Sequence, residues 1–241
     1  MKLRAAQSTN EKQQRIDGRR PPAFIFDLDG TLVDSVYQHV LAWSEALERA
    51  HLELSVWRIH RRIGMSGGLF VNALSRETGR NITPRQAAQL QRDHVRAFRR
   101  QKGKIRPLPG ARALLAHLSR LDVPWAIATS ARLETAQPSL KLLGVGPRAL
   151  IVTRDQVAHA KPDPDLFLAA ADRLGVDITE TLVVGDSVWD LLAARRARAL
   201  GVGLLSGGYG FDELERAGAY RVYQDPADLL IHLDEVGVRS Q

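Results

Sequence analysis

Short apolar runs alternate with helical patterns through most of this 241-residue chain, and each run stops at glycine or a polar residue. The runs cover 23–26, 125–128, 149–152, 181–184 and 201–205, and the helical patterns cover 111–120, 136–143, 164–174 and 188–198. Continuous apolar runs of this length are typical of strands that are buried on both faces. Strands that alternate with helices predict an α/β fold, a parallel sheet covered by helices on both sides.

The interval 36–106 breaks this alternation. It has helical periodicity throughout and no convincing strand, and it includes a predicted helix at 84–100 with Thr83 as its N-cap. About seventy helical residues inserted after the first strand predict a separate all-α domain. The sheet domain then consists of 21–35 and 107–241, and the polar segment 1–20 is expected to be a flexible basic tail.

The net charge of +7 is unevenly distributed. Residues 36–107 carry fourteen Lys and Arg against five Asp and Glu, and residues 1–20 carry six against two. This excess either attracts an anionic substrate or forms a solvated Arg-rich helical surface, and the sequence leaves both open. We expect no nucleic-acid partner, because the arginines lie on helical patterns without an accompanying recognition motif.

The composition excludes several classes of protein. The chain has no cysteine, which excludes disulfides, thiolate catalysis and Cys-based zinc sites. No apolar run approaches the ~18 residues that span a bilayer, and the N-terminus lacks the apolar stretch of a secretory signal. We therefore expect a cytoplasmic protein without a membrane partner.

Polar side chains follow the predicted strands where each strand ends. Because parallel strands place their carboxyl ends at one edge of the sheet, these side chains are expected to converge on one crevice. They are Asp27 and Asp29 after the first strand, Thr129 and Ser130 after the second, Lys161 after the third, and Asp186 after the fourth.

These residue types fit phosphoryl transfer. Asp27, Asp29 and Asp186 form an oxygen-rich site of the kind that Mg²⁺ prefers. Alone they would repel a phosphate dianion by roughly 4 kcal/mol per charge pair at 4 Å, which the cation and Lys161 would offset. Asp27 can then attack phosphorus, while Asp29 protonates the departing oxygen and later deprotonates a water. Thr129 can donate a hydrogen bond to a phosphoryl oxygen.

Two longer motifs make the pattern specific. Residues 26–35 read Phe-Asp-Leu-Asp-Gly-Thr-Leu-Val-Asp-Ser, and residues 185–190 read Gly-Asp-Ser-Val-Trp-Asp. The chain resembles the haloacid dehalogenase superfamily with a helical cap inserted after the first strand, in the phosphoglycolate phosphatase and beta-phosphoglucomutase-like subgroup. The resemblance implies a Rossmann-like, doubly wound parallel sheet core with the cap at 36–106.

The resemblance also implies roles for individual residues. Asp27 is the expected nucleophile and a Mg²⁺ ligand, and Asp29 is the expected general acid and base, with its backbone carbonyl on the metal. Thr129 is expected to bind phosphate with Lys161, and Ser130 competes for the position of Thr129 because the register at a strand end is uncertain by one residue. Further metal ligands are Asp186 and Asp190, the latter either as a direct ligand or as support for the ligands.

The expected reaction is Mg²⁺-dependent hydrolysis of a small phosphorylated metabolite, phosphoglycolate or a sugar phosphate, through an aspartyl-phosphate intermediate. Asp29 argues against dehalogenation, since a halide leaves without a proton. A phosphomutase is the alternative, although Gly67 and Gly68 stand where such mutases carry a basic residue. A binding protein on this fold would need catalytic residues to be missing, and none is.

The inserted cap is expected to select the substrate. Arg61 and Arg62 begin its most loop-like segment. Either one of them binds a second anionic group of the substrate, or both form surface salt bridges. His39 lies either near the leaving group or in cap–core packing. The sequence leaves a monomer and a homodimer equally open.

Overall fold

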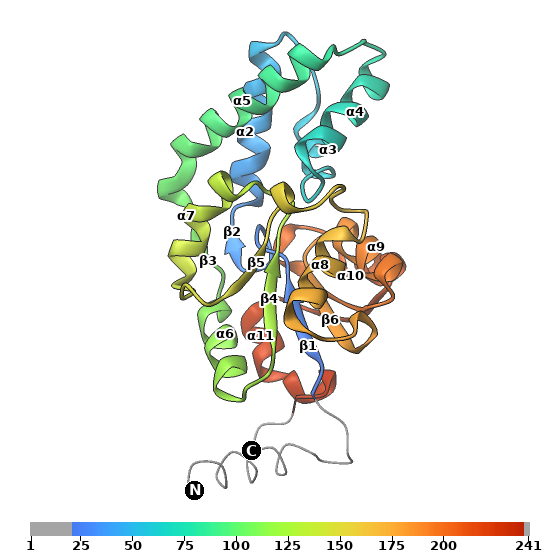
Figure 1. Ribbon diagram of the computed structural model, residues 1–241. Helices are drawn as coiled ribbons and strands as arrows, with labels where there is room; N and C mark the ends of the chain where they lie inside the picture. Colours follow the sequence, from blue (N-terminus) through green and yellow to red (C-terminus); the bar gives the residue numbers. More distant parts are fainter. Residues whose placement is uncertain (1–20, 239–241) are drawn as a thin grey trace, which may run out of the picture.

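The computed structural model describes residues 21–238, so the predicted basic tail at 1–20 lies outside the described residues. Its centre is a six-stranded sheet in which every neighbouring pair is parallel (Figure 1). In spatial order the strands are β5 (Leu150–Val152), β4 (Trp125–Ala128), β1 (Ala23–Phe26), β6 (Thr181–Gly185), β7 (Leu200–Leu204) and β8 (Ala219–Tyr223). This confirms the predicted α/β fold with a parallel sheet.

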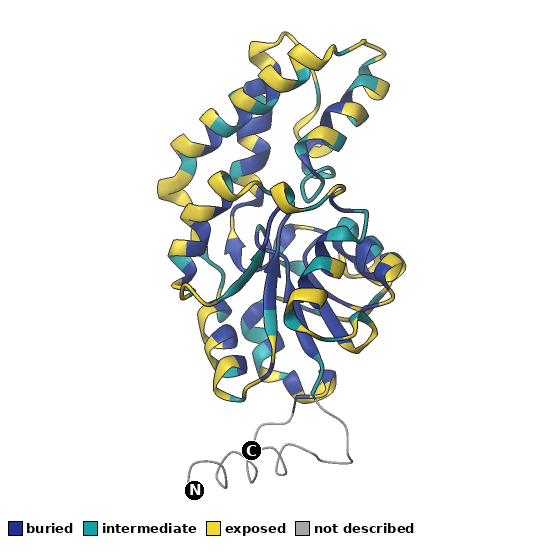
Figure 2. Ribbon diagram, in the orientation of Figure 1, coloured by how far each residue is buried: buried dark blue, intermediate teal, exposed yellow. Residues whose placement is uncertain are grey.

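Helices cover both faces of the sheet because successive strand residues point to opposite sides. On β1, Phe24 and Phe26 pack in one apolar cluster, and Ile25 packs in the other. The first cluster includes residues of α6 (Ala111–Arg120), α7 (Leu133–Leu143) and α11 (Pro226–Ile231). The second includes residues of α8 (Asp165–Leu174) and α9 (Val188–Ala197). Figure 2 shows the central strands as largely buried.

The segment between β2 (Val33–Asp34) and β3 (Arg106–Pro107) is helical, and these two short strands pair antiparallel beneath it. Its helices are α2 (Val36–Arg49), α3 (Val56–His60), α4 (Gly67–Thr78) and α5 (Pro84–Gln101). Thr83 is the N-cap of α5, as predicted, and it also forms a capping box with Gln86. The segment has its own apolar cluster and lies beyond the carboxyl ends of the strands (Figure 1). We refer to residues 36–106 as the cap; the boundary positions remain a prediction.

The remaining elements connect the sheet to its helices. Helix α10 (Phe211–Ala217) precedes β8, and short 3₁₀ turns occur at Lys102–Lys104, Arg154–Gln156, Ile178–Glu180, Leu205–Gly207 and Leu233–Val236. Strand β8 was not predicted, because this edge strand is half exposed and lacks a continuous apolar run. Among residues 21–238, no helix combines the length and apolarity needed to cross a bilayer.

Candidate active site

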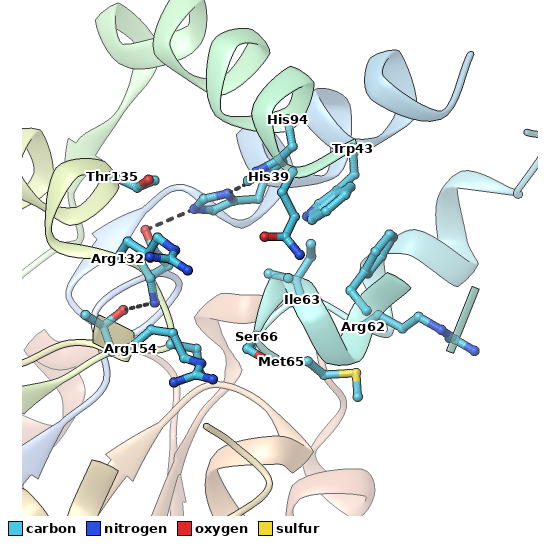
Figure 3. A pocket seen from close by; sticks show the side chains of 18 of the residues that line it. His39, Trp43, Arg62, Ile63, Met65, Ser66, His94, Arg132, Thr135 and Arg154 are labelled. Carbon is cyan, nitrogen blue, oxygen red and sulfur yellow. Dashed lines mark hydrogen bonds and ion pairs between the residues drawn. The ribbon is translucent and has the colours of Figure 1, made fainter. Parts of the chain in front are cut away.

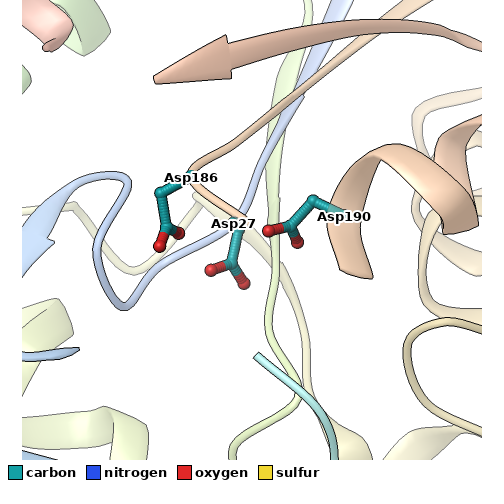
Figure 4. Close-up of side chains that lie close together, drawn as sticks. All are labelled: Asp27, Asp186 and Asp190. Atoms are coloured by element: carbon teal, nitrogen blue, oxygen red, sulfur yellow. The ribbon is translucent and has the colours of Figure 1, made fainter. Parts of the chain in front are cut away.

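The predicted polar residues converge where β1, β4 and β6 end. Figure 4 shows Asp27 from the end of β1, Asp186 from the end of β6 and Asp190 from α9 with their carboxylates turned toward one another. One oxygen from each lies within 4.8 Å of the others, and all three residues are buried. Parallel strands predict that Asp27 and Asp186 meet at one edge of the sheet, whereas Asp190 was expected only from the family resemblance.

Lys161 supplies a positive charge to this cluster. Its Nζ forms ion pairs with Asp27 and, at 2.8 Å, with Oδ1 of Asp190. Burial alone would lower the pKa of Lys161, but the two carboxylates raise it above its ordinary value. The two carboxylates thus favour the charged form of Lys161, whose side chain has no solvent access.

The acidic residues outnumber this cation. Burial raises the pKa of Asp27 to about 7, although Lys161 partly opposes the rise. Burial and the carboxylates of Asp190 and Asp27 raise the pKa of Asp186 well above its ordinary value. Three clustered carboxylates next to one lysine leave excess negative charge, and a hard divalent cation is the group that such an oxygen donor set fits.

Asp29 has a different environment from Asp27. Burial would raise its pKa, but His39, Ser35 and Lys161 together lower it. The Ser35 hydroxyl donates a 2.6 Å hydrogen bond to Asp29 Oδ1, and His39 Nε2 lies 3.4 Å from the same oxygen. Two carboxyl groups, two residues apart, thus have pKa values shifted in opposite directions, which shows that they lie in different environments although both face the same cavity.

Neighbouring residues hold the carboxylates of Asp186 and Asp190 in place. Thr31 donates a 2.9 Å hydrogen bond to Asp186 Oδ1. Gly207 approaches the same carboxylate so closely that a Cβ there would lie 1.8 Å from Asp186 Oδ2. Asp190 accepts hydrogen bonds from the backbone N–H and the hydroxyl of Ser187, at 3.1 and 2.5 Å. Asp190 is thus oriented by the first turn of α9 and by Lys161.

The two phosphate-binding candidates after β4 differ in their contacts. Thr129 Oγ1 accepts a 3.0 Å hydrogen bond from the backbone N–H of Ala131, which leaves its own proton free to donate. The Ser130 hydroxyl is buried and has no hydrogen-bond partner among the described residues. Both line the cavity beside Asp27 and Asp29, so the geometry is compatible with either as a phosphate ligand.

A cavity of about 330 Å³ separates these residues from the cap. Its cap side includes His39 and Trp43 of α2, and Figure 3 shows the ring of His39 next to His94. His39 Nδ1 and His94 Nε2 are 3.1 Å apart. His94 was not among the predicted site residues, although its spacing from Leu90 and Phe98 on α5 places it on the buried face of that helix.

The two cap arginines lie in ion pairs. The guanidinium of Arg61 pairs with Glu213 of α10 and stacks over the Tyr209 ring, 4.5 Å from its centroid. Arg62 pairs with Glu77 of α4. The structure therefore has the salt bridges that the sequence left open as one alternative, while a substrate contact for either arginine remains a prediction.

The end of α3 connects the cap to the core. The backbone carbonyl of Arg61 accepts hydrogen bonds from Trp189 Nε1 and the Tyr209 hydroxyl, at 3.1 and 3.0 Å. His60 Nε2 lies 2.8 Å from the carbonyl oxygen of Gly207. These contacts hold this part of the cap against the loop that also packs on Asp186.

Comparison with known proteins gives matches over most of the chain. The family model for haloacid dehalogenase-like hydrolases matches residues 21–198. Hexitol phosphatase A of Escherichia coli is 35% identical over 181 residues, 74% of this chain and 80% of that protein. A phosphoglycolate phosphatase of Neisseria meningitidis is 33% identical over 198 residues, 78% of this chain and 81% of that protein.

A solved structure extends the similarity to the three-dimensional fold. The crystal structure of a hydrolase from Pseudomonas syringae is 57% identical and superposes with a TM-score of 0.88. The match covers 90% of this chain and 100% of the Pseudomonas syringae chain. The overall architecture of this chain therefore has a counterpart in an experimental structure.

Proposed function

We propose that this chain, which belongs to the haloacid dehalogenase-like hydrolases, hydrolyses small phosphate monoesters in a Mg²⁺-dependent reaction with Asp27 as the nucleophile. The chain is an enzyme of the phosphatase class, as are the curated relatives named above. The observation that carries the proposal is the geometry of Asp27 and Asp29, which face one cavity: Asp27 lies in the buried cluster with Asp186, Asp190 and Lys161, and Asp29 lies beside Ser35 and His39.

The metal part of the proposal rests on charge balance. Asp27, Asp186 and Asp190 are buried within 4.8 Å of one another, and Lys161 neutralises only part of their charge. Mg²⁺ would be held by the carboxylates of Asp27, Asp186 and Asp190 and by the backbone carbonyl of Asp29. The ion would neutralise negative charge on the phosphoryl oxygens and on Asp27.

The proposed first step forms a bond between an Asp27 carboxylate oxygen and phosphorus and breaks the bond between phosphorus and the ester oxygen. Asp29 gives its proton to the departing alkoxide, so the alcohol leaves neutral. Lys161 holds Asp27 in place, and the hydroxyl of Thr129 or Ser130 donates to a phosphoryl oxygen. The product of this step is the aspartyl phosphate on Asp27.

The second step returns the enzyme to its starting state. Asp29, now a carboxylate, takes a proton from a water, and the water oxygen attacks phosphorus. The bond between phosphorus and Asp27 breaks, and inorganic phosphate leaves. The contacts of His39 and Ser35 with Asp29 would fix the direction of its carboxyl group.

The test is a phosphate-release screen with and without Mg²⁺, on an aryl phosphate, phosphoglycolate and sugar phosphates. We expect Mg²⁺-dependent release by the wild type and none by Asp27→Asn. Retained hydrolysis in this variant would exclude Asp27 as the nucleophile. Conversion of a sugar phosphate to its isomer with little free phosphate would instead establish the phosphomutase alternative.

A further inference from the structure

We propose that residues 60–64 of the cap help to position the carboxylates of Asp186 and Asp190, so that docking of the cap on the core and binding of Mg²⁺ strengthen each other. We refer to residues 60–64, the end of α3 and the turn that follows it, as the α3 turn. This role rests on the proposed function, because that function requires the ion. The α3 turn contacts the segments that hold the two carboxylates at three places.

The first contact joins His60 to the loop that packs on Asp186. Because a carbonyl oxygen only accepts hydrogen bonds, His60 donates its Nε2 proton to the Gly207 carbonyl, at 2.8 Å. The backbone of Gly207 lies against the Asp186 carboxylate, where a Cβ would come within 1.8 Å of Oδ2. On the core side, the Ser206 hydroxyl donates a 2.6 Å hydrogen bond to the Gly30 carbonyl. His60 and Ser206 thus hold this loop against Asp186 from the cap and from the core.

The second contact joins Gly64 to the first turn of α9. Gly64 has φ +97°, and a Cβ on it would lie 2.8 Å from Ser187 Oγ and 3.2 Å from Trp189 Cδ1. Ser187 is the residue whose hydroxyl and backbone N–H donate hydrogen bonds to Asp190. The cap backbone therefore packs directly on the side chain that orients the Asp190 carboxylate.

The third contact is the backbone carbonyl of Arg61, which lies between the other two. This carbonyl accepts hydrogen bonds from Trp189 Nε1 and from the Tyr209 hydroxyl, at 3.1 and 3.0 Å. Trp189 directly precedes Asp190 in the chain, and Tyr209 lies two residues after Gly207. One carbonyl of the cap thus links the two segments that support the metal ligands.

These contacts can couple the cap to the ion because they are small and polar. Domains joined by interfaces of this kind move relative to each other by default. A ligand that binds the docked arrangement more tightly shifts the cap toward it, and docking raises the affinity for that ligand by the same factor. Mg²⁺ is such a ligand, because its strict octahedral coordination requires Asp186 and Asp190 to keep their positions.

The experiment measures the dissociation constant of Mg²⁺ by isothermal titration calorimetry on the full chain without substrate. His60→Phe keeps an aromatic ring beside Tyr37, whose ring centroid lies 5.5 Å from that of His60, and removes the N–H donor. We expect this variant to raise the dissociation constant by about tenfold, as for other residues that support metal ligands. Tyr209→Phe removes one of the two donors to the Arg61 carbonyl and should raise it by about threefold.

Two control variants separate the hydrogen bonds from the side chains that carry them. His60→Gln retains an N–H donor and should keep most of the wild-type affinity for Mg²⁺. Tyr220→Phe removes the hydroxyl of an exposed tyrosine on β8 and should leave the affinity unchanged.

The reciprocal effect is measured by hydrogen–deuterium exchange. Saturating Mg²⁺ should slow the exchange of backbone amides in residues 56–66 of the wild type, because the ion favours the docked cap. The same addition should slow exchange less in His60→Phe, in which one of the three contacts is missing.

Three results would overturn the inference. The first is an equal Mg²⁺ dissociation constant in the wild type, His60→Phe and Tyr209→Phe. The second is an equal loss of affinity in His60→Phe and His60→Gln, and the third is exchange at residues 56–66 that does not respond to Mg²⁺. A wild type that binds no Mg²⁺ would instead overturn the metal part of the proposed function, so the two failures are distinguishable.

Discussion

Replacing Lys161 with methionine removes the one buried cation of the carboxylate cluster while keeping an unbranched apolar side chain. In the structure, Lys161 is fully buried and its Nζ pairs with Asp27 and Asp190. Removing one partner of a buried ion pair leaves an uncompensated charge and costs about 3–5 kcal/mol of unfolding free energy. We expect Lys161→Met to be destabilised by this amount at pH 8, in buffer that chelates divalent cations.

The loss of unfolding free energy in Lys161→Met should depend on pH. Burial already raises the pKa of Asp27 from 3.8 to about 7, and the loss of Lys161 removes an interaction that lowers it. A carboxyl group with a raised pKa binds its proton more tightly in the folded than in the unfolded state, so stability falls as pH rises through that interval. At pH 5 the folded variant can protonate Asp27, and its deficit relative to wild type should shrink.

Urea unfolding at pH 5 and pH 8 measures both effects. The matched control is Lys104→Met, since Lys104 is exposed in the turn after α5 and should change stability by no more than about 0.5 kcal/mol. A deficit below about 1 kcal/mol for Lys161→Met at pH 8 would refute the reasoning from buried charge. An equal deficit at both pH values would refute the link to carboxyl protonation.

Two other substitutions test separate parts of the site. Asp29→Asn should reduce hydrolysis of an alkyl phosphate by about 10²–10⁴-fold and of an aryl phosphate by less, because only the poorer leaving group needs its proton; equal losses would count against a general-acid role. Gly207→Ala should raise the Mg²⁺ concentration for half-maximal activity by about tenfold or more, because its Cβ displaces Asp186. Gly68→Ala, whose Cβ meets nothing within 4 Å, should not, and equal Mg²⁺ requirements in both variants would contradict the steric argument.

The core of the site was predictable because parallel strands align their carboxyl ends. Once the apolar runs were identified as strands, Asp27, Thr129 and Asp186 had to meet at one edge of the sheet. The close approach of Gly30 was not predicted: this glycine has φ +88° and leaves no room for a Cβ beside Asp186. Local sequence therefore gave the position of these groups but not their orientation.

The cap side of the cavity was less predictable, because it depends on how helices dock on one another and on the core. His94 meets His39 only when α5 packs on α2, a contact between residues 55 positions apart. The ion pair of Arg61 with Glu213 joins residues 152 positions apart. Helical periodicity gives the buried face of each helix but not its partner, so neither pair could be derived from one sequence. Strand β8 was not predicted for a different reason: its exposed residues leave no continuous apolar run that would indicate a buried strand.

The central claim is that the phosphoryl group is transferred to Asp27 before it is released as phosphate. The most direct measurement is chemical identification of the phosphorylated residue. Turnover of an aryl phosphate with Mg²⁺ is stopped by acid, the acyl phosphate is reduced with borohydride, and the peptides are analysed by mass spectrometry. We predict conversion of aspartate to homoserine at position 27 in the wild type and no modified peptide in Asp27→Asn. Modification at another residue, or wild-type turnover by Asp27→Asn, would contradict the account.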